Sequence, residues 1–214
     1  MARGRAAGYD DQREAILAHA AELFAHRGYA GTTMNDIADA CGLSKATLYH
    51  YFRDKHALLV SICEGHVLTL RALADEIGAQ QLDPEPKLRA LIHRIVAAYT
   101  GAQHAHRVLT DDVRFLDADD RERVLGTERA LVAAVARTVA AMRPDLADAA
   151  LAKPLTMLLF GMVNWMFTWF RAGGTLDHET FAPIVADLFV GGLRATHAPA
   201  PELDAFQEMR ALRA

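Results

Sequence analysis

Apolar residues recur along most of the chain with the spacing of helices. The first such segment covers about residues 11–27 and is followed by Gly28, where a helix commonly ends. One stripe of this helix surface carries Ile16, Leu17, Ala20, Ala21 and Phe24. Strict alternation of apolar and polar residues, which would indicate a strand, does not extend beyond a few positions. The pattern predicts an all-α protein.

Capping residues and glycines divide the next part of the chain into short helices. Ser, Thr and Asp side chains accept hydrogen bonds from the first free amides of a helix, and glycine commonly follows its last turn. The expected boundaries are Thr33 to Gly42 for a second helix, Ser44 to about Tyr51 for a third, and Asp54 to about Gly78 for a fourth.

Beyond a turn-rich break at 78–87, the same periodicity predicts further helices, about nine in all. The expected ranges are 86–102, 106–116, 118–142, 148–172 and 180–196. Pro154 should kink or restart one of them, and Pro183 fits a helix that starts at Thr180 better than one that starts at Asp177. The longest uncharged stretch, 154–170, is shorter than the roughly 20 residues of a membrane span, so we expect a buried helix and no membrane.

The segment 33–52, TMNDIADACGLSKATLYHYF, has the spacing of two short helices that cross at a tight turn. The small side chain of Ala38 lets the two helices cross closely, and Gly42 supplies the tight turn. Beneath them, a small core is expected from Ile37, Cys41, Leu43, Leu48 and Tyr51. This is the layout of a helix-turn-helix, whose second helix enters the DNA major groove. An ordinary corner of two helices with a polar outer face has the same spacing.

Six residues of the third helix and its cap are left pointing outward. Their hydroxyl, ammonium, phenol and imidazole groups suit phosphates and base edges. They are Ser44, Lys45, Ala46, Thr47, Tyr49 and His50. The whole chain has a net charge of −4, which argues against nucleic acid as a partner, but the local charge is positive. The basic residues around this element are Arg3, Arg5, Lys45, Arg53 and Lys55, with Asp54 as the nearby acid.

Residues 13–59, REAILAHAAELFAHRGYAGTTMNDIADACGLSKATLYHYFRDKHALL, closely resemble the N-terminal DNA-binding domain of the TetR family of transcriptional regulators. The most specific runs are ELFAHRGYAGTTMNDIA and SKATLYHYFRDKHALL. The resemblance implies a homodimer that places two recognition helices in successive major grooves of a palindromic operator in double-stranded DNA. It also implies phosphate anchors at Thr33 and Lys55, and a reading face of Ser44, Thr47, Tyr49 and His50. The methyl group of Ala46 can touch a thymine methyl group.

The run LTMLLFGMVNWMFTWF, residues 155–170, is apolar nearly all round, so it must be buried on more than one side. A four-helix dimer interface from the helices near 154–171 and 180–196 of two chains satisfies this need, and TetR proteins generally use one. A core helix of a monomer would show the same composition.

The longer run at 160–189 resembles a TetR subgroup that responds to acyl-coenzyme A thioesters of fatty-acid, phenylacetate and steroid breakdown. That resemblance implies an acyl or aryl group among apolar side chains, with the nucleotide phosphates near basic residues. The candidate ligand-binding residues are Met162, Trp165, Met166, Trp169, Arg107 and Arg114, with Arg94 and Arg171 as further basic candidates. Core packing and surface solvation explain the same residues, and a regulator of drug efflux that senses a hydrophobic or cationic compound is the alternative function.

Other chemistries find little support. Cys41 and Cys63 lack the spacing of a disulfide framework or a zinc site, and His104 and His106 would point about 200° apart on a helix. Glycine-rich phosphate loops, HExxH and GxSxG are absent from the sequence, so we expect neither an enzyme nor a cofactor. The sequence therefore predicts a cytoplasmic, ligand-responsive repressor with a helix-turn-helix domain at 1–53 and a larger helical ligand-binding and dimerisation domain at 54–214.

Overall fold

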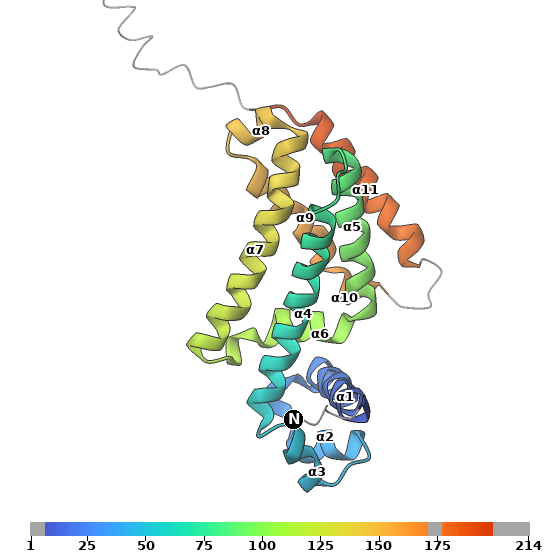
Figure 1. Ribbon diagram of the computed structural model, residues 1–214, viewed down its shortest axis with the longest axis vertical. Helices are drawn as coiled ribbons and strands as arrows, with labels where there is room; N and C mark the ends of the chain where they lie inside the picture. Colours follow the sequence, from blue (N-terminus) through green and yellow to red (C-terminus); the bar gives the residue numbers. More distant parts are fainter. Residues whose placement is uncertain (1–6, 171–176, 199–214) are drawn as a thin grey trace, which may run out of the picture.

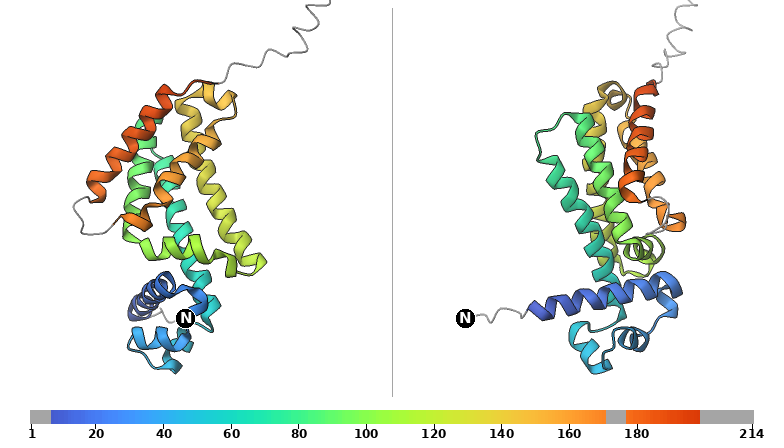
Figure 2. Two further views of the ribbon diagram at one scale, coloured as in Figure 1. Left: turned by 180° about the vertical axis from the view of Figure 1, so that it is seen from behind. Right: turned by 90° about the vertical axis from the view of Figure 1, so that its right-hand side faces the viewer.

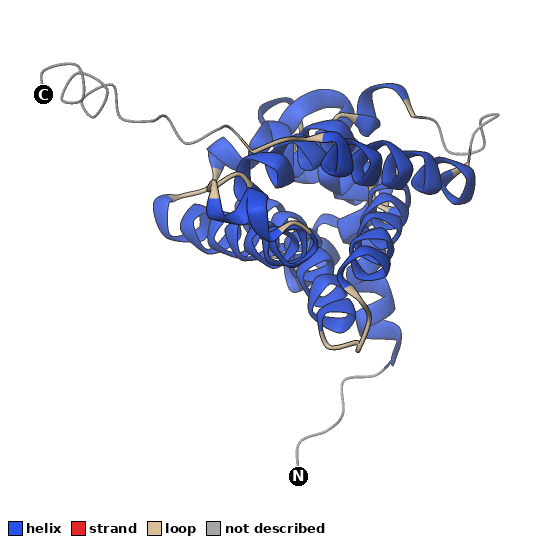
Figure 3. Cartoon of the chain, turned by 90° about the horizontal axis from the view of Figure 1, so that it is seen from above, coloured by secondary structure: helices blue, strands red, loops and turns tan. Residues whose placement is uncertain are grey.

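The computed structural model describes residues 7–170 and 177–198, and these residues form helices and connecting loops without a strand (Figures 1 and 3). The all-α prediction is confirmed. The expectations for Arg3, Arg5 and Arg171 lie outside the described residues. The helices are α1 (Ala7–Gly31), α2 (Met34–Ala40), α3 (Lys45–Tyr51), α4 (Lys55–Gly78), α5 (Pro84–Gly101), α6 (Gln103–Asp112), α7 (Ala118–Met142), α8 (Pro144–Asp148), α9 (Ala152–Asn164), α10 (Met166–Trp169) and α11 (His178–Ala195), with a 3-10 turn at Val113–Phe115.

A small unit of α1, α2 and α3 lies at one end of a larger helical body, and α4 runs from the small unit into that body (Figure 1). Helix α1 crosses beneath the body, while α5, α7, α9 and α11 extend along it (Figure 2). The small unit therefore presents α2 and α3 at the far end of the molecule, away from the body.

Two clusters of buried apolar side chains hold this arrangement together. The first joins α1, α2, α3 and the first half of α4 to Val108 and Leu109 of α6 and to Val124 of α7. The second fills the body between the rest of α4 and helices α5, α7, α9, α10 and α11. Helix α4 contributes side chains to both clusters. The expected domain boundary between residues 53 and 54 therefore falls within the first cluster, and this boundary stays a prediction.

Helix α4 also has the length and mean hydropathy of a membrane span. Its apolar residues pack into both clusters, from Leu58 and Leu59 at one end to Ile77 at the other. Packing inside the protein therefore accounts for its composition, as in the core helix of a water-soluble domain.

The predicted capping residues at three helix starts are confirmed. Thr33 forms a capping box with Asp36, Ser44 accepts a hydrogen bond from the Thr47 amide, and Asp54 accepts one from the Ala57 amide. The two predicted turn glycines have positive φ, 75° at Gly28 and 64° at Gly42. Residues with a side chain rarely adopt this conformation, which explains glycine at both turns.

Two predictions about the later helices are wrong. The helix expected at 148–172, with a kink or restart at Pro154, is instead α9, which starts at Ala152 and ends at Asn164, followed by the short α10. Pro154 lies in the first turn of α9, where its missing amide hydrogen costs nothing. Helix α11 starts at His178 and not at Thr180, because Asp177 caps it through the Thr180 amide and Pro183 is accommodated inside it.

Candidate nucleic-acid interface and internal cavity

The third helix has one buried side and one open side, as the sequence predicts. Leu48 is fully buried beneath it, while Cys41, Leu43 and Tyr51 are half-buried around it. The six residues expected on the outer face are all exposed: Ser44, Lys45, Ala46, Thr47, Tyr49 and His50. Leu48 therefore anchors α3 to the core, while the exposed side of α3 lies at the end of the molecule, where Figure 1 shows this helix.

Hydrogen bonds and ring contacts fix several of these side chains. The hydroxyl groups of Ser44 and Thr47 lie 2.8 Å apart and share a hydrogen bond, and the Ser44 oxygen also accepts from the Thr47 amide. The Lys45 ammonium lies 6.0 Å from the centre of the Tyr49 ring, at cation–π distance. Lysine and tyrosine thus reach outward together from neighbouring turns of α3.

A tyrosine from α1 supports the end of α3. The Tyr9 ring stacks on Tyr51 with centroids 4.7 Å apart and meets His50 edge-on at 6.3 Å. The sequence predicts Tyr51 in the small core but does not indicate Tyr9, because no local pattern links α1 to a residue so far along the chain. The contact limits the orientations that the His50 imidazole can take.

Thr33 is placed differently from a phosphate anchor. Its hydroxyl lies 2.5 Å from Asp36 Oδ2, and its backbone amide donates to the same oxygen at 2.8 Å. These hydrogen bonds hold the pKa of the Asp36 carboxyl below its usual value. A carboxylate already occupies the start of α2, where a phosphate would bind, and Arg27 lies 3.6 Å from it. The structure therefore gives Thr33 the part of a helix cap.

Lys55 shows the largest departure from expectation. Its ammonium donates to the backbone oxygens of Tyr29 at 2.7 Å and of Thr32 at 2.8 Å, and it lies 4.3 Å from the Tyr29 ring centre. The charge thus satisfies free carbonyls at the end of α1, where a cation is favoured. Instead of pointing outward to a phosphate, Lys55 holds the start of α4 against the end of α1.

The larger helical body contains an enclosed cavity of about 240 Å³. Helices α4, α5, α6, α7 and α9 contribute to its wall. Leu70, Leu131 and Phe160 give it an apolar surface, while Tyr99 and Glu128 bring polar groups to it. Burial raises the pKa of the Glu128 carboxyl above its usual value.

A chain of hydrogen bonds runs from this cavity into α4. The Tyr99 hydroxyl donates to Asn164 Oδ1 at 2.8 Å, and His106 Nε2 lies 3.2 Å from the Asn164 backbone oxygen. Because a carbonyl can only accept, His106 Nε2 carries the hydrogen, and His106 Nδ1 accepts from His66 Nε2 at 3.2 Å. The chain fixes the tautomer of His106 and joins α9, α6 and α4.

The two histidines in this series of hydrogen bonds, His66 and His106, are neutral at pH 7. Burial lowers the pKa of His66 to about 4, with a further contribution from neighbouring His106. Burial also lowers the pKa of His106 to about 4, although its hydrogen bond to Asn164 acts in the opposite direction. A buried imidazole loses the hydration that stabilises its charged form, so the two rings resist protonation.

A basic groove adjoins the cavity. It lies between α7 and α9, has a volume of about 770 Å³ and shares Leu125, Glu128, Val132 and Met157 with the cavity wall. Its rim carries three cationic side chains, which are Arg129, Arg137 and Lys153. An apolar chamber and a positively charged rim therefore lie side by side.

None of the six candidate ligand residues lines the cavity. Met166 is buried in the core, and Arg107 and Arg114 line a separate polar depression beside Asp111 and Asp112. Met162, Trp165 and Trp169 are exposed, with Trp165 showing 63% of its surface. The six candidate ligand residues therefore lie apart from this cavity, and their role in ligand binding stays a prediction.

Helices α9, α10 and α11 lie on one side of the molecule (Figure 2). The exposed tryptophans belong to a set of large, exposed apolar residues on this side. We call it the apolar face, and it consists of Leu158, Met162, Trp165, Trp169, Ile184 and Leu188. Gly161, Gly191 and Gly192 are also exposed there, and a β-carbon added to any of them would meet no atom within 4 Å. A group of large apolar residues left exposed in this way typically marks a contact with another protein.

Comparisons with known proteins agree with this arrangement. The family described as "Bacterial regulatory proteins, tetR family" matches residues 16–62, and the one described as "Tetracyclin repressor-like, C-terminal domain" matches residues 81–193. The transcriptional repressor KstR2 of Rhodococcus jostii is 30% identical over 195 residues, which cover 89% of this chain and 95% of that protein.

Solved structures share the fold. A TetR-family regulator from Bordetella parapertussis superimposes with a TM-score of 0.80 at 33% identity, covering 87% of this chain and 98% of that one. AibR, solved with isovaleryl coenzyme A and operator DNA, gives a TM-score of 0.69 at 24% identity, covering 83% of this chain and 97% of that one.

Proposed function

Because this chain belongs to the tetR family of bacterial regulatory proteins, we propose that it is a homodimeric repressor released from a palindromic operator by a small apolar effector. It is a DNA-binding transcriptional regulator and not an enzyme. The observation that carries the proposal is the position of α4, which joins the exposed recognition helix α3 to the wall of the internal cavity. We place its action in the cytoplasm, where the operator is found.

The proposed dimer forms through the apolar face. A twofold axis there would cover the exposed tryptophans and leucines of both chains and would place the two α3 helices in successive major grooves. The exposed glycines allow helices of the two chains to approach closely. Dimerisation thus sets the distance between the two reading surfaces.

The proposed release is a shift between two arrangements of α4. Val67 and Leu70 bring α4 to the cavity wall, and His66 ties it to the hydrogen-bond chain from Asn164. An effector that binds better when α4 has moved favours dimers whose α3 helices no longer match the groove spacing. By reciprocity, operator DNA must weaken effector binding by the same factor.

We favour an acyl-coenzyme A thioester as the effector. The apolar chamber suits an acyl or aryl group, and the rim residues Arg129, Arg137 and Lys153 suit phosphates. A cationic drug is the alternative, because the Glu128 carboxyl lines the chamber. AibR holds isovaleryl coenzyme A on the same fold, which recommends that thioester as a first probe.

The effector proposal is tested on a duplex selected from random sequence by the protein itself. We expect isovaleryl- or octanoyl-coenzyme A to lower operator affinity at least about tenfold, and free coenzyme A to lower it less, as measured by fluorescence anisotropy. Arg137→Ala with Lys153→Ala should weaken the thioester response, while Arg121→Ala, on the same helix but outside the groove, should not. Release by tetraphenylphosphonium but by no thioester would favour the alternative, and equal thioester affinity with and without operator would contradict the release mechanism.

Lys45→Ala is expected to weaken operator binding roughly three- to tenfold and to reduce the slope of log affinity against log salt by about 1. The side chain is exposed on α3, so its loss removes one phosphate contact and leaves the fold intact. The matched control is Lys87→Ala, whose ammonium donates to the Gly78 oxygen at the opposite end of α4. An unchanged salt slope for Lys45→Ala would mean that the docking surface lies elsewhere.

A further inference from the structure

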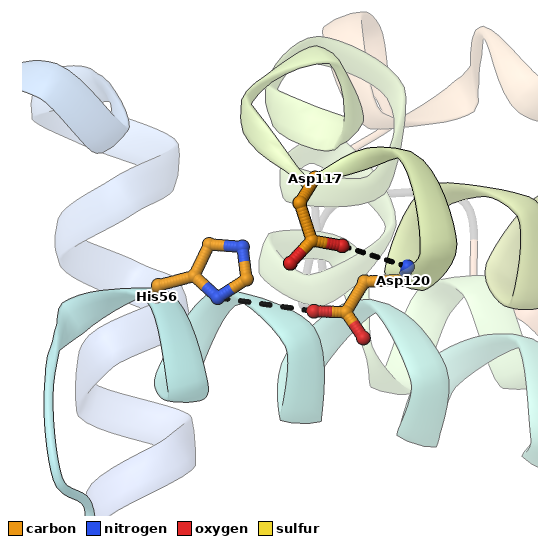
Figure 4. A group of neighbouring side chains, drawn as sticks. All are labelled: His56, Asp117 and Asp120. Carbon is orange, nitrogen blue, oxygen red and sulfur yellow. Dashed lines mark hydrogen bonds and ion pairs between the residues drawn. The ribbon is translucent and has the colours of Figure 1, made fainter.

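A histidine and two aspartates meet where α4 and α7 begin (Figure 4). His56 lies in the first turn of α4, Asp117 is the N-cap residue of α7, and Asp120 lies in the first turn of α7. One donor atom of each residue lies within 4.8 Å of the other two. No local sequence pattern indicates this cluster, because its members lie on two helices that are distant along the chain.

A hydrogen bond from the protein holds one oxygen of each carboxylate. Asp117 Oδ1 accepts from the Asp120 amide at 2.9 Å, and Asp120 Oδ1 accepts from Arg123. Arg123 is itself held by Glu64 on α4, at 2.9 Å. The second oxygens of Asp117 and Asp120 are turned toward the His56 imidazole (Figure 4). Outer hydrogen bonds of this kind orient the ligands of metal sites.

The distances favour shared ligation over a direct hydrogen bond. His56 Nδ1 and Asp120 Oδ2 are 3.8 Å apart, beyond the roughly 3.2 Å limit of a good hydrogen bond. Two ligands of a tetrahedral cation, each about 2.1 Å from it, are about 3.4 Å apart, so a small side-chain shift closes the site. A simple ion pair between His56 and Asp120 would involve only two of the three residues.

Two of the three side chains are partly buried, and the third is open to solvent. The side chains of His56 and Asp120 are 26% and 17% exposed, whereas Asp117 is open to solvent. A cation can therefore enter past Asp117 and lose part of its water to the two sheltered ligands. One nitrogen and two carboxylate oxygens suit Zn²⁺ and neighbouring transition metals, since Mg²⁺ and Ca²⁺ take oxygen ligands.

We propose that His56, Asp117 and Asp120 form a site for a divalent transition-metal cation, with water completing its coordination. The cation ties the first turn of α4, which follows the recognition helix by a short loop, to the start of α7 in the helical body. Its occupancy therefore fixes the small DNA-facing unit against the rest of the chain. The site stands on this geometry alone and does not depend on the effector proposed above.

The test is zinc and cobalt binding to the full-length protein after treatment with EDTA. We expect one Zn²⁺ per chain by titration calorimetry and cobalt absorption bands that indicate nitrogen and oxygen ligands. His56→Ala should weaken binding at least tenfold, and Asp120→Asn should do the same while keeping an acceptor for Arg123. Zinc at about 100 times its Kd should raise the unfolding temperature of the wild type by about 5 °C and that of His56→Ala much less.

The chain offers a matched control in His26 and His104, whose exposed rings lie 5.3 Å apart and form another possible metal-binding pair. The double variant His26→Ala, His104→Ala should bind zinc as the wild type does. If His56→Ala fails to fold by circular dichroism, Asp117→Asn replaces it, because the amide oxygen can still cap α7. Zinc binding that is absent in the wild type, unchanged in the folded variant, or lost in the control variant would overturn the proposal.

Discussion

Leu158→Glu combined with Leu188→Glu is expected to convert the dimer into monomers and to lower operator affinity more than about 100-fold. Both side chains lie in the apolar face, with 65% and 66% of their surfaces exposed in the single chain. Covering a leucine stabilises an interface by roughly 1.5–3 kcal/mol, and a dimer covers four of them, whereas buried unpaired carboxylates oppose association. The lost operator affinity follows because a monomer engages one half-site only.

Sedimentation velocity and fluorescence anisotropy measure the two effects on the same samples. The matched control is Leu68→Glu, which places the same charge on an exposed leucine of α4 outside the apolar face, 54% exposed. It should remain dimeric and bind operator normally. A double variant that stays dimeric at micromolar concentration would move the dimer interface away from α9 and α11.

Acidification from pH 7 to pH 5 is expected to lower the free energy of unfolding by about 2 kcal/mol for each of His66 and His106. Unfolded histidines take up protons below about pH 6.5, whereas in the folded chain the pKa of each is about 4. The unfolded state therefore binds more protons throughout this window, and stability is lost as the pH falls. Urea unfolding at several pH values measures the slope.

His66→Gln should make this pH dependence shallower, because one of the two buried imidazoles no longer titrates. His104→Gln is the matched control, because His104 is exposed and lies only two residues from buried His106. The comparison concerns the slope and not the stability at one pH, so a variant that is weaker overall still gives an answer. Equal slopes in wild type and His66→Gln would show that these rings are hydrated in the folded chain.

The parts of the structure that sequence predicts well are those set by neighbours along the chain. The caps at Thr33, Ser44 and Asp54 depend on amides three residues ahead, and the exposed face of α3 follows from its helical period. Each of these features is decided within one or two helical turns. For that reason the local pattern was sufficient to identify the helix-turn-helix and its outer residues.

Features that depend on contacts between distant segments were beyond the sequence. The carbonyls that hold Lys55 belong to residues 26 and 23 positions earlier, at an irregular turn after Gly28. A lysine at a helix start therefore suggested a phosphate contact, although the fold provides it with backbone oxygens. The same limit explains why the cavity wall, assembled from five helices, was not found.

The tryptophans show a related limit. The sequence makes Trp165 and Trp169 candidates for a ligand pocket because they lie in an apolar run. Which way the side chains of such a run point depends on how its helix packs against the rest of the protein. In the structure both indoles are exposed, Trp165 directly after α9 and Trp169 at the end of α10. The polar groups that do reach the chamber, such as Glu128, lie on a helix that the sequence presents as an ordinary charged surface.

Helix α4 has a practical implication for protein engineering. Its first half shares one apolar cluster with α1, α2 and α3 and with residues from α6 and α7. A fragment cut after Arg53 would lose Leu58, Leu59 and the partners that cover them, so it would not survive as an autonomous module. Fusing this DNA-binding unit to another ligand-binding domain therefore requires a fusion point beyond α4. The new domain must also supply apolar side chains in place of those that α6 and α7 contribute to the cluster.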